Sequence, residues 1–430
     1  WTGNLSTGNT DSPVTIGTYS LTGGTHTIRA WTTNPNGVAD EYNLNDTSET
    51  SVLACDVLNG TYTVGGGAPD YATFQDAIDA MINCGINGPV VFNVRTGTYT
   101  EQLVIPPIAG ASATNTITFQ SETGVNTDVV LDHPSQTSST DNFCVQLNDA
   151  DYFTFNNITI SRSGSNDYAR VVEFINNADN NSIENCRIIS TNSTSSSSAG
   201  IYSSTTIDNN NTISNNTITG GYYGIYWYGS GSTSLEEGSL IKDNTITGFY
   251  YYGMYIYYQD GIIIEGNTLR NRAGVSTAYG IYPHYCDNDF EITKNDIYLN
   301  ASTSNYCLYV YYCDGTNPSP GLVANNFISQ STGTSTTYGL YSYYTYYTNY
   351  YNNNINITGP YSSSRGAYLY YGDNIEFVNN IVVNTGGGMC VYASPGTNVT
   401  DIDYNDYYWT GANLGYYGAN RADLAAWQGA

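Results

Sequence analysis

Short segments of alternating apolar and polar residues recur along the chain from about residue 150 onward. One phrase, seen as FTFNNITI, SIENCRII, TISNNTIT and LIKDNTIT, has apolar residues two apart on either side of an asparagine. A period of two is typical of β-strands, and asparagine tolerates the left-handed conformation of a tight turn. The phrase therefore predicts pairs of short strands joined by a turn, returning every 23 to 31 residues. Its anchors are Asn157, Asn185, Asn216, Asn244, Asn267, Asn295, Asn326, Asn354, Asn380 and Asn405.

A second phrase alternates with the first and reads GIYWYG, GMYIYY, CLYVYY or GAYLYY. Its anchors are Gly200, Gly224, Gly253, Gly280, Cys307, Gly339, Gly366 and Gly388. The first and third residues after each anchor are mostly apolar and should point inward, so the second and fourth should point outward. The outward positions predict two tyrosine columns. The first holds Tyr226, Tyr255, Tyr282, Tyr309, Tyr341 and Tyr368, and the second holds Tyr228, Tyr257, Tyr311, Tyr343, Tyr370 and Tyr392, with His284 in its gap.

Together the two phrases predict a solenoid rather than a row of separate domains. Helical repeats of this length would show a continuous period of 3.6 residues, which this stretch lacks. Parallel strands of successive coils lie roughly 4.8 Å apart, so equivalent side chains would stack above one another. We therefore expect an all-β fold in which a parallel β-helix occupies residues 101–405.

The residues before the repeats predict a capping helix. Between Tyr71 and Ile86 the apolar residues recur at helical spacing, and the pattern stops at Gly85. A helix here would cover the open edge of the first coil. At the other end, NRADLAAWQGA predicts a short helix with Trp427 as a cap. The apolar residues of the first helix are Phe74, Ala77, Ile78, Met81 and Ile82.

The aligned asparagines are interpreted as structural. Stacked asparagine side chains in β-solenoids bond one another and the turn backbone, in the manner of an amide ladder. The predicted ladder comprises Asn157, Asn185, Asn216, Asn244, Asn295, Asn326, Asn354 and Asn380.

Composition narrows the class of protein. The 430 residues include 37 Asp plus Glu against 11 Lys plus Arg, a net charge of -26, which disfavours nucleic acid as a partner. With 40% apolar residues the chain should fold, and it has no apolar run long enough to insert into a membrane. Eight cysteines, few lysines and many Asn-x-Ser/Thr triplets favour an extracellular glycoprotein.

The cysteine spacing suggests two disulfides. Cys286 and Cys313 stand at the same offset in adjacent coils, where parallel neighbours bring Cα atoms within about 5 Å. Cys55 and Cys84 flank the capping helix and form the second candidate pair. The other four cysteines are interpreted as small buried apolar residues.

The segment from Asp70 to about Gly124 resembles the entry to right-handed parallel β-helix proteins of the pectin-lyase-like superfamily, in which a capping helix precedes a GTYxE strand, here GTYTE. The closing phrase DYNDYY…LAAWQ is similar to that of large secreted β-helix proteins of Bacteroidota, and residues 1–54 resemble part of an adhesion-type immunoglobulin-like module. The resemblance implies a partial immunoglobulin-like β-sandwich at 1–54, a cap at 55–100, a right-handed β-helix at 101–405 and a second cap at 406–430.

Enzyme motifs of this superfamily are mostly missing. Asn126-Thr127-Asp128 matches one polygalacturonase phrase, but its partner phrases are absent, and Asp132-His133 only faintly resembles a lyase strand. No catalytic residue is predicted. The three histidines show no metal-ligand spacing, so no metal or other cofactor is expected; calcium in the aspartate-rich turns stays a weak alternative. Those turns contain Asp46, Asp401, Asp403 and Asp406.

The functional prediction is a structural or adhesive protein of the bacterial cell surface. The tyrosine columns either stabilise the stack or form a contact stripe for carbohydrate or another subunit, and both interpretations stay open. Because the amino-terminal module matches only part of a sandwich, we expect subunits to join head to tail into a homopolymeric filament, or else a longer chain to supply the rest. The alternative function is a carbohydrate-binding or polysaccharide-degrading β-helix.

Overall fold

The computed structural model describes residues 17–21, 23–31, 47–204 and 206–430, which fall into two compact units divided after Leu58. In the first unit, β1 (Gly24–Trp31) and β2 (Thr47–Ala54) form an antiparallel two-stranded sheet. Most of the predicted immunoglobulin-like module, and Asp46 with it, lies outside the described residues.

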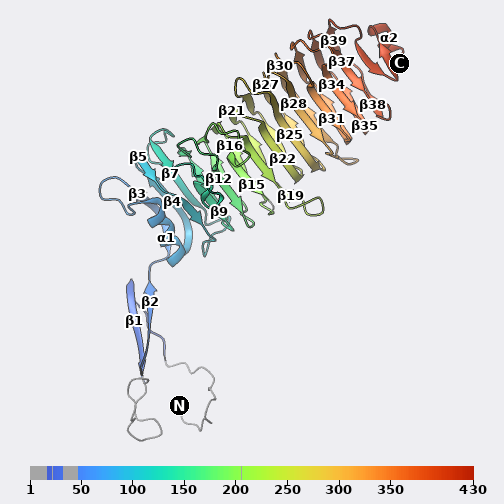
Figure 1. Cartoon of the computed structure of the whole chain (residues 1–430). Helices are drawn as coiled ribbons and strands as arrows, with labels where there is room; N and C mark the ends of the chain where they lie inside the picture. The colour runs from blue at the N-terminus through green and yellow to red at the C-terminus, as the bar shows by residue number, and fades with distance from the viewer. Residues whose placement is uncertain (1–16, 22, 32–46, 205) are drawn as a thin grey trace, which may run out of the picture. The chain divides into compact units, whose positions relative to one another are not determined.

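The second unit is a parallel β-solenoid, as the repeats predict (Figure 1). Each coil contributes one strand to each of three sheets, and Figure 1 shows the strands stacked in order from α1 to α2. The three sheets are named I, II and III in the order in which each coil enters them. Strands β3, β4 and β5, which precede residue 101, already belong to these sheets.

Sheet I has 13 strands, which make the first side of each coil. They are β3 (Leu58–Val64), β4 (Ile86–Val94), β7 (Ile117–Ser121), β10 (Phe153–Asn156), β13 (Ser182–Glu184), β16 (Thr212–Ser214), β20 (Leu240–Lys242), β23 (Ile263–Glu265), β26 (Glu291–Thr293), β29 (Gly321–Ala324), β32 (Tyr346–Tyr351), β35 (Asp373–Val378) and β38 (Val399–Asp401).

Sheet II has 12 strands and follows sheet I after a two-residue turn in most coils. They are β5 (Gly97–Thr100), β8 (Val129–Asp132), β11 (Thr159–Ser161), β14 (Arg187–Ile189), β17 (Thr217–Thr219), β21 (Thr245–Phe249), β24 (Thr268–Asn271), β27 (Asp296–Leu299), β30 (Phe327–Gln330), β33 (Asn354–Ile357), β36 (Ile381–Asn384) and β39 (Asp406–Trp409).

Sheet III has 14 strands, counting the short β19 that pairs only with β22, and it ends in an antiparallel pair, β40 with β41. They are β6 (Leu103–Ile105), β9 (Val145–Asn148), β12 (Ala169–Ile175), β15 (Ser198–Ser204), β18 (Tyr223–Tyr228), β19 (Glu236–Glu237), β22 (Tyr252–Asp260), β25 (Thr277–Asp287), β28 (Ser304–Tyr311), β31 (Thr337–Tyr343), β34 (Arg365–Tyr370), β37 (Met389–Ala393), β40 (Gly415–Tyr417) and β41 (Ala419–Arg421).

The helix predicted before the repeats is present as α1 (Phe74–Cys84). Thr73 and Asp76 form a capping box at its start, and the Glu101 carboxylate accepts hydrogen bonds from the first backbone N–H groups. Phe74 and Met81 are buried, but Ile82 is 45% exposed and was wrongly placed on the buried face. At the carboxyl end of the chain, the short helix α2 (Leu424–Gln428) has Trp427 as its buried residue. A short 3-10 helix, η2 (Ser139–Asp141), lies between β8 and β9.

In-register stacking makes the core from columns of like residues. On sheet II the inward residues Ile188, Ile218 and Ile246 stand above one another and are fully buried. The glycine anchors of sheet III face this column closely: a Cβ on Gly224 would lie 2.4 Å from Ile246 Cγ2 and 2.6 Å from the Gly253 carbonyl oxygen. Glycine is therefore needed here for space between the two sheets.

The buried asparagine ladder lies at the corner between sheets I and II. Asn295 is typical: its Oδ1 accepts from the backbone N and the Nδ2 of Asn267, both at 3.0 Å, and its Nδ2 donates to Ile264 O at 2.9 Å. The same bonds repeat from coil to coil and satisfy backbone groups that the turn leaves without partners. The ladder comprises Asn216, Asn244, Asn267, Asn295, Asn326, Asn353, Asn380 and Asn405.

Three members of the predicted ladder are wrong by one residue. Asn157 and Asn185 have φ values of 54° and 55°, so they occupy the left-handed turn position just before the ladder. Ile158 and Cys186 take the ladder position in those coils, and the Cys186 backbone N–H donates to Asn216 Oδ1. Asn354 follows the ladder residue Asn353 and begins β33.

The cysteines divide into two groups. Cys55 and Cys84 are both disulfide-bonded. Cys286 and Cys313, predicted to pair, are both free and buried, and the Cys286 backbone N–H donates to Cys313 Sγ at 3.4 Å. Side chains at the same offset in parallel coils point the same way, so their Cβ atoms stay about one coil apart, farther than the roughly 3.8 Å of a disulfide.

Glu236 of β19 is a buried carboxyl that lies beside Gln259 of β22. Glu236 accepts hydrogen bonds from Trp227 Nε1 at 2.7 Å, from Asp208 N at 3.0 Å and from Gln259 Nε2 at 2.5 Å. Burial raises the pKa of Glu236 to about 8, against the hydrogen bonds, which favour its charged form. The neighbouring Asp208, also buried, has its pKa raised for the same reason.

We expect Asn295→Ala to lower the chemical denaturation midpoint strongly, because Ile264 O and two donors of Asn267 lose their buried partner at about 1–3 kcal/mol each. Asn356→Ala, on the exposed surface of β33, is the matched control. Equal midpoints for the two variants would contradict the ladder's role.

We also expect Glu236→Gln to change how stability depends on pH. A carboxyl whose pKa is raised in the folded state contributes stability that is complete below its unfolded pKa, near 4.5, and is lost as pH rises through about 8. The variant should therefore lose less stability between pH 5 and 8 than the unmodified chain, measured by urea denaturation. Glu237→Gln, at the exposed neighbouring position, should leave the pH profile unchanged.

Candidate functional site

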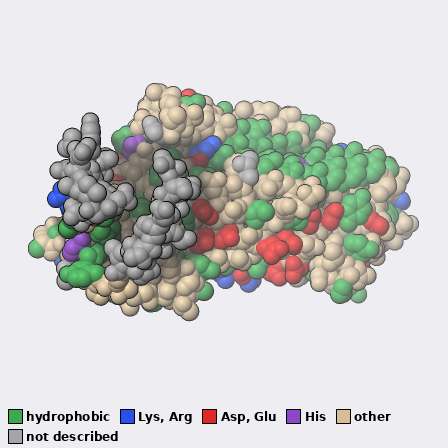
Figure 2. Space-filling view, turned by 90° about the horizontal axis from the view of Figure 1, so that it is seen from below, with side chains coloured by type: hydrophobic (Ala, Val, Ile, Leu, Met, Phe, Trp, Pro, Cys, Tyr) green, Lys and Arg blue, Asp and Glu red, His purple; other side chains and the backbone are tan. Residues whose placement is uncertain are grey.

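Tyrosine side chains cover the outward surface of sheet III. Along β18, Ile225 and Trp227 are buried, whereas Tyr226 and Tyr228 alternate with them and are half-buried at the surface. The same alternation continues on β22 and β28. Figure 2, which colours tyrosine with the hydrophobic residues, shows a continuous band of such side chains along the solenoid.

The first column runs farther than the sequence phrases predict. Its ring centroids lie 4.4–5.5 Å apart, and most neighbouring rings are parallel. Tyr392, assigned to the second column from the Gly388 anchor, belongs here because Tyr368 pairs with it in the sheet register. The column comprises Tyr202, Tyr226, Tyr255, Tyr282, Tyr309, Tyr341, Tyr368, Tyr392 and Tyr416.

The second column contains a histidine in its middle. His284 lies 4.0 Å from Tyr257 and 4.2 Å from Tyr311, in edge-to-face geometry with both. Neither ring nitrogen has a hydrogen-bond partner, and burial lowers the pKa of His284 to about 3, so the ring is neutral at physiological pH. The tyrosines of this column are Tyr228, Tyr257, Tyr311, Tyr343 and Tyr370.

Two further columns were missed by the sequence analysis. The third stands directly before the glycine and cysteine anchors and comprises Tyr223, Tyr252, Tyr279, Tyr306 and Tyr338. The fourth uses the second residue of each Tyr-Tyr or His-Tyr doublet and comprises Tyr258, Tyr285, Tyr312, Tyr344 and Tyr371. The recurring doublets were the signal that would have revealed it. The four columns together are called the Tyr face below.

The fourth column is held in an unfavourable backbone conformation. Its five tyrosines have φ between 47° and 58°, the left-handed region that costs most residues roughly 1–2 kcal/mol each. Elsewhere in the solenoid this conformation is mostly taken by asparagine or glycine, as at Asn325 and Gly266. Placing tyrosine at these turns extends the Tyr face around the corner of the coil at the expense of stability, which points to a functional surface.

Packing within the Tyr face favours the uncharged form of several of its hydroxyl groups. Burial against neighbouring rings raises the pKa of Tyr255 to about 12, and the nearby phenols act in the same direction. Tyr309 and Tyr341 are raised further for the same reason. The face therefore presents ring edges and neutral hydroxyl groups that donate and accept hydrogen bonds.

A row of carboxylates borders the fourth column. Glu237, Asp260 and Asp287 occupy one lateral position on adjacent strands, and Asp314 continues the row, with its backbone N–H donating to Asp287 Oδ1 at 3.2 Å. Burial, and next the repulsion from Asp287, raise the pKa of Asp314 to about 7. Burial is also the main cause that raises the pKa of Asp287 to about 6. None of the ion pairs among the described residues includes a carboxylate of this row.

Two arginines contact rings of the first column. The Arg170 guanidinium lies 3.4 Å from the centroid of Tyr202, at the start of the first column. The Arg365 guanidinium lies 3.9 Å from both Tyr368 and Tyr392. Both distances are within the range of cation–π attraction.

The residues considered for catalysis are engaged in structural roles. Asp132 accepts hydrogen bonds from Ser161 Oγ at 2.6 Å, Ser163 N at 3.0 Å and Ser163 Oγ at 2.6 Å. Asp128 accepts from Thr123. Within the described residues, no cluster of three His, Cys, Asp or Glu side chains is suited to a metal ion; Asp401, Asp403 and Asp406 are exposed there.

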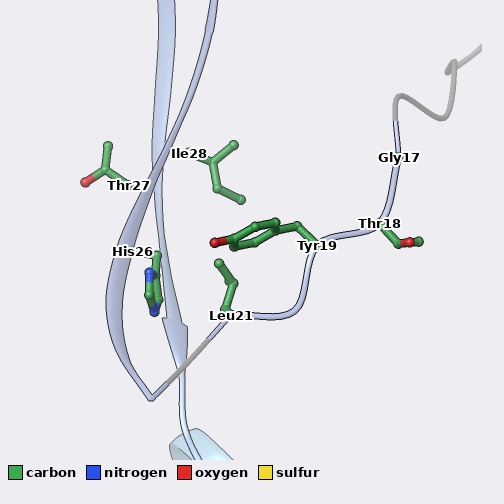
Figure 3. A pocket seen from close by; sticks show the side chains of 7 residues that line it. All are labelled: Gly17, Thr18, Tyr19, Leu21, His26, Thr27 and Ile28. Carbon is green, nitrogen blue, oxygen red and sulfur yellow. The ribbon is translucent and has the colours of Figure 1, made fainter.

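Two further depressions lie on the surface, one in the first unit and one on sheet II. A depression in the first unit is lined by Tyr19, Leu21, His26 and Ile28, with Tyr19 87% exposed (Figure 3). On sheet II a shallow apolar groove surrounds the exposed Phe327 and Ile381. Neither helix in the described ranges is long and apolar enough to cross a bilayer.

Comparison with solved structures gives fold relationships at low identity. A GH136 lacto-N-biosidase from Eubacterium ramulus matches with a TM-score of 0.54 and 12% identity over 81% of this chain and 68% of that chain. The pectate lyase Pel9A matches with a TM-score of 0.48 and 14% identity over 81% and 80% of the two chains. PfbA, a surface adhesin of Streptococcus pneumoniae, matches with a TM-score of 0.47 and 15% identity over 80% and 88%.

Comparison with curated proteins gives no match. The family model described as "Right handed beta helix region" matches residues 143–300 and 234–403, which together span more than half of the chain. With three parallel sheets and one strand of each per coil, the protein belongs to the right-handed β-helix family.

Proposed function

We propose that the protein is an extracellular adhesive element of a bacterial cell surface and that the Tyr face is its contact surface. The observation that carries this proposal is the fourth column, where five tyrosines adopt a strained backbone conformation and lengthen an aromatic surface that the fold alone does not require. Tyrosine is enriched at protein interfaces because its ring and hydroxyl contact both apolar and polar groups.

Stabilisation by stacking accounts for only part of this surface. Each stacked pair contributes roughly 0.2–1 kcal/mol, which suits the first and second columns. Stacking in the fourth column is offset by the backbone conformation of its tyrosines. Most other turns place asparagine or glycine in this conformation, so a contact role accounts for the tyrosine at this turn in five successive coils.

Assembly end to end into a filament remains part of the proposal. Sheets I and II end at β38 and β39, whose outer edges have no strand partner among the described residues, and head-to-tail contacts that do not close by rotation produce filaments. Electron microscopy of the purified chain would show filaments one solenoid wide; separate particles across a wide concentration range would reject this assembly without affecting the Tyr face.

A second candidate is action on polysaccharides. Asp287 and Asp314 are half-buried carboxyls on adjacent coils with raised pKa values, beside an aromatic surface. Paired carboxyls with separated roles are the arrangement that glycoside hydrolysis uses. Release of reducing ends from a polysaccharide by the unmodified chain, abolished in Asp314→Asn, would favour this candidate over adhesion.

We expect the intact chain to bind some members of a panel of immobilised cellulose, chitin, pectate, collagen and fibrinogen. Replacing Tyr311 and Tyr343, which are only half-buried, by serine should weaken that binding about tenfold, because both aromatic rings and their phenolic hydroxyls are lost. Biolayer interferometry measures the effect.

The matched control replaces Tyr404 and Tyr408, exposed tyrosines before and within β39 of sheet II, by serine. A variant with phenylalanine at positions 311 and 343 keeps the stacking of these two rings and separates loss of contact from loss of stability. Equal loss in the control, or no binding to any panel member, would reject the Tyr face as the contact surface.

A further inference from the structure

A small cavity lies where the loop between β33 and β34 meets the edge of the Tyr face. Its volume is about 160 Å³, and it is lined by Ser362, Ser363, Ser364, Arg365, Met389 and Tyr392. None of these side chains is acidic, although the chain has 37 Asp plus Glu residues. The charged group that lines the cavity is therefore a cation, which attracts an anion.

The cation is held in place by aromatic rings. Arg365 follows Tyr338 in the register of the third column. Its guanidinium carbon lies 3.9 Å from the ring centroids of Tyr368 and Tyr392, and 5.6 Å from that of Tyr338. Ring contacts engage the face of a guanidinium, and its five in-plane N–H groups exceed what the neighbouring Tyr368 hydroxyl accepts. Donors of Arg365 thus remain for a ligand.

Arg365 differs from other arginines that lie over tyrosine rings. Arg170 and Arg270 also lie over such rings, and each forms an ion pair, with Glu173 and Asp296 respectively. Among the described residues, no carboxylate forms an ion pair with Arg365. The chain therefore orients this guanidinium without neutralising it.

The serine loop brings further donors to the cavity. The Ser364 backbone N–H donates to Tyr361 O at 2.9 Å and closes a turn around Ser362 and Ser363, which are both exposed. Within the described chain, the hydroxyls and backbone N–H groups of these two serines have no hydrogen-bond partner. Several donors beside one guanidinium suit an oxyanion that has several acceptor oxygens.

The row of carboxylates on the Tyr face lies at the opposite edge of that face. Arg365 begins β34, and Tyr371 of the fourth column follows its last residue. At the 3.3 Å per residue of a strand, the chain from Arg365 to Tyr371 spans about 20 Å. Charges in water are largely screened beyond about 8 Å at physiological ionic strength. A single anionic group therefore meets mainly the field of Arg365, whereas the net charge of -26 disfavours a polyanion.

We propose that this cavity binds the sulfate or phosphate ester group of a glycan that lies on the Tyr face. Arg365 and the serine donors would hold the ester oxygens, and Tyr392 and Met389 would contact the sugar ring. Such an ester presents three oxygens to these donors, whereas a carboxylate presents two. A peptide fits less well because β34 is paired with both β31 and β37, which leaves no strand edge for its backbone. The inference rests on the proposed contact role of the Tyr face and names its ligand's chemistry.

The test is calorimetry of the full chain with ligands that share one sugar ring. Glucose 6-sulfate and glucose 6-phosphate should show saturable binding, glucuronate should bind about tenfold more weakly, and glucose should not bind. Inorganic sulfate should bind about tenfold more weakly than glucose 6-sulfate, because it lacks the contacts of the sugar ring. Equal affinity for these two would indicate a site for the free ion and would overturn the glycan assignment.

Variants locate the binding. Arg365→Gln should abolish binding of glucose 6-sulfate, and Arg365→Lys should weaken it about tenfold because the planar fork is lost. Ser362→Ala with Ser363→Ala should weaken it about threefold without changing the denaturation midpoint, since both serines are exposed. The matched control is Arg187→Gln, which removes the same charge from sheet II. No saturable binding of either ester, a preference for glucuronate, or equal loss in the control would overturn the inference.

Failure of this inference differs from failure of the proposed function. If neither ester binds but Tyr311→Ser with Tyr343→Ser still weakens binding to the panel of surfaces, the Tyr face is a contact surface for another chemistry. If that variant binds the panel as the unmodified chain does, the proposed function itself fails.

Discussion

The in-register stacking of parallel strands is the constraint on which the rest of this structure depends. Once successive coils lie roughly 4.8 Å apart without a shift in register, each residue type is repeated as a column. A favourable neighbour then recurs in every coil, as in the asparagine ladder, and so does an unfavourable one. The row from Glu237 to Asp314 shows the second case, because stacking brings like charges together.

The same constraint explains which residues fill each position. From β8 to β36 the inward column of sheet II that contains Ile188, Ile218 and Ile246 holds isoleucine, leucine or valine, and the sheet III residue opposite is glycine where a Cβ would collide with it. Where cysteine replaces glycine, as at Cys307 and Cys390, the thiol is buried and donates to a backbone carbonyl of sheet II. The interior is thus specified by the fit between columns more than by any single contact.

Much of the fold was predictable from the sequence because strand alternation and repeat length are local signals. The parallel solenoid, the helix α1 and the alternation of Ile225 with Tyr226 all followed from such signals. The exact ladder register did not, since Asn352, Asn353 and Asn354 are adjacent and only the turn conformation distinguishes them. Tyr392 was assigned to the wrong column because Gly388 resembles the glycine that begins the other phrases. The sheet register instead places Cys390 beside Gly366, which moves Tyr392 to the first column. The two edge-to-face contacts within the first column, Tyr255 with Tyr282 and Tyr368 with Tyr392, depend on ring rotation, which no sequence pattern encodes.

The asparagine ladder also has a consequence for how the protein can vary in length. Between Asn244 and Asn380, each pair of adjacent coils is joined by the same asparagine hydrogen bonds. If one coil within this span were removed or duplicated, the coils that become neighbours could therefore form these same hydrogen bonds. Stability in such arrays is approximately a sum over coils and their interfaces. The reach of the molecule is therefore adjustable in steps of one coil, and each added coil brings another row of tyrosines with it.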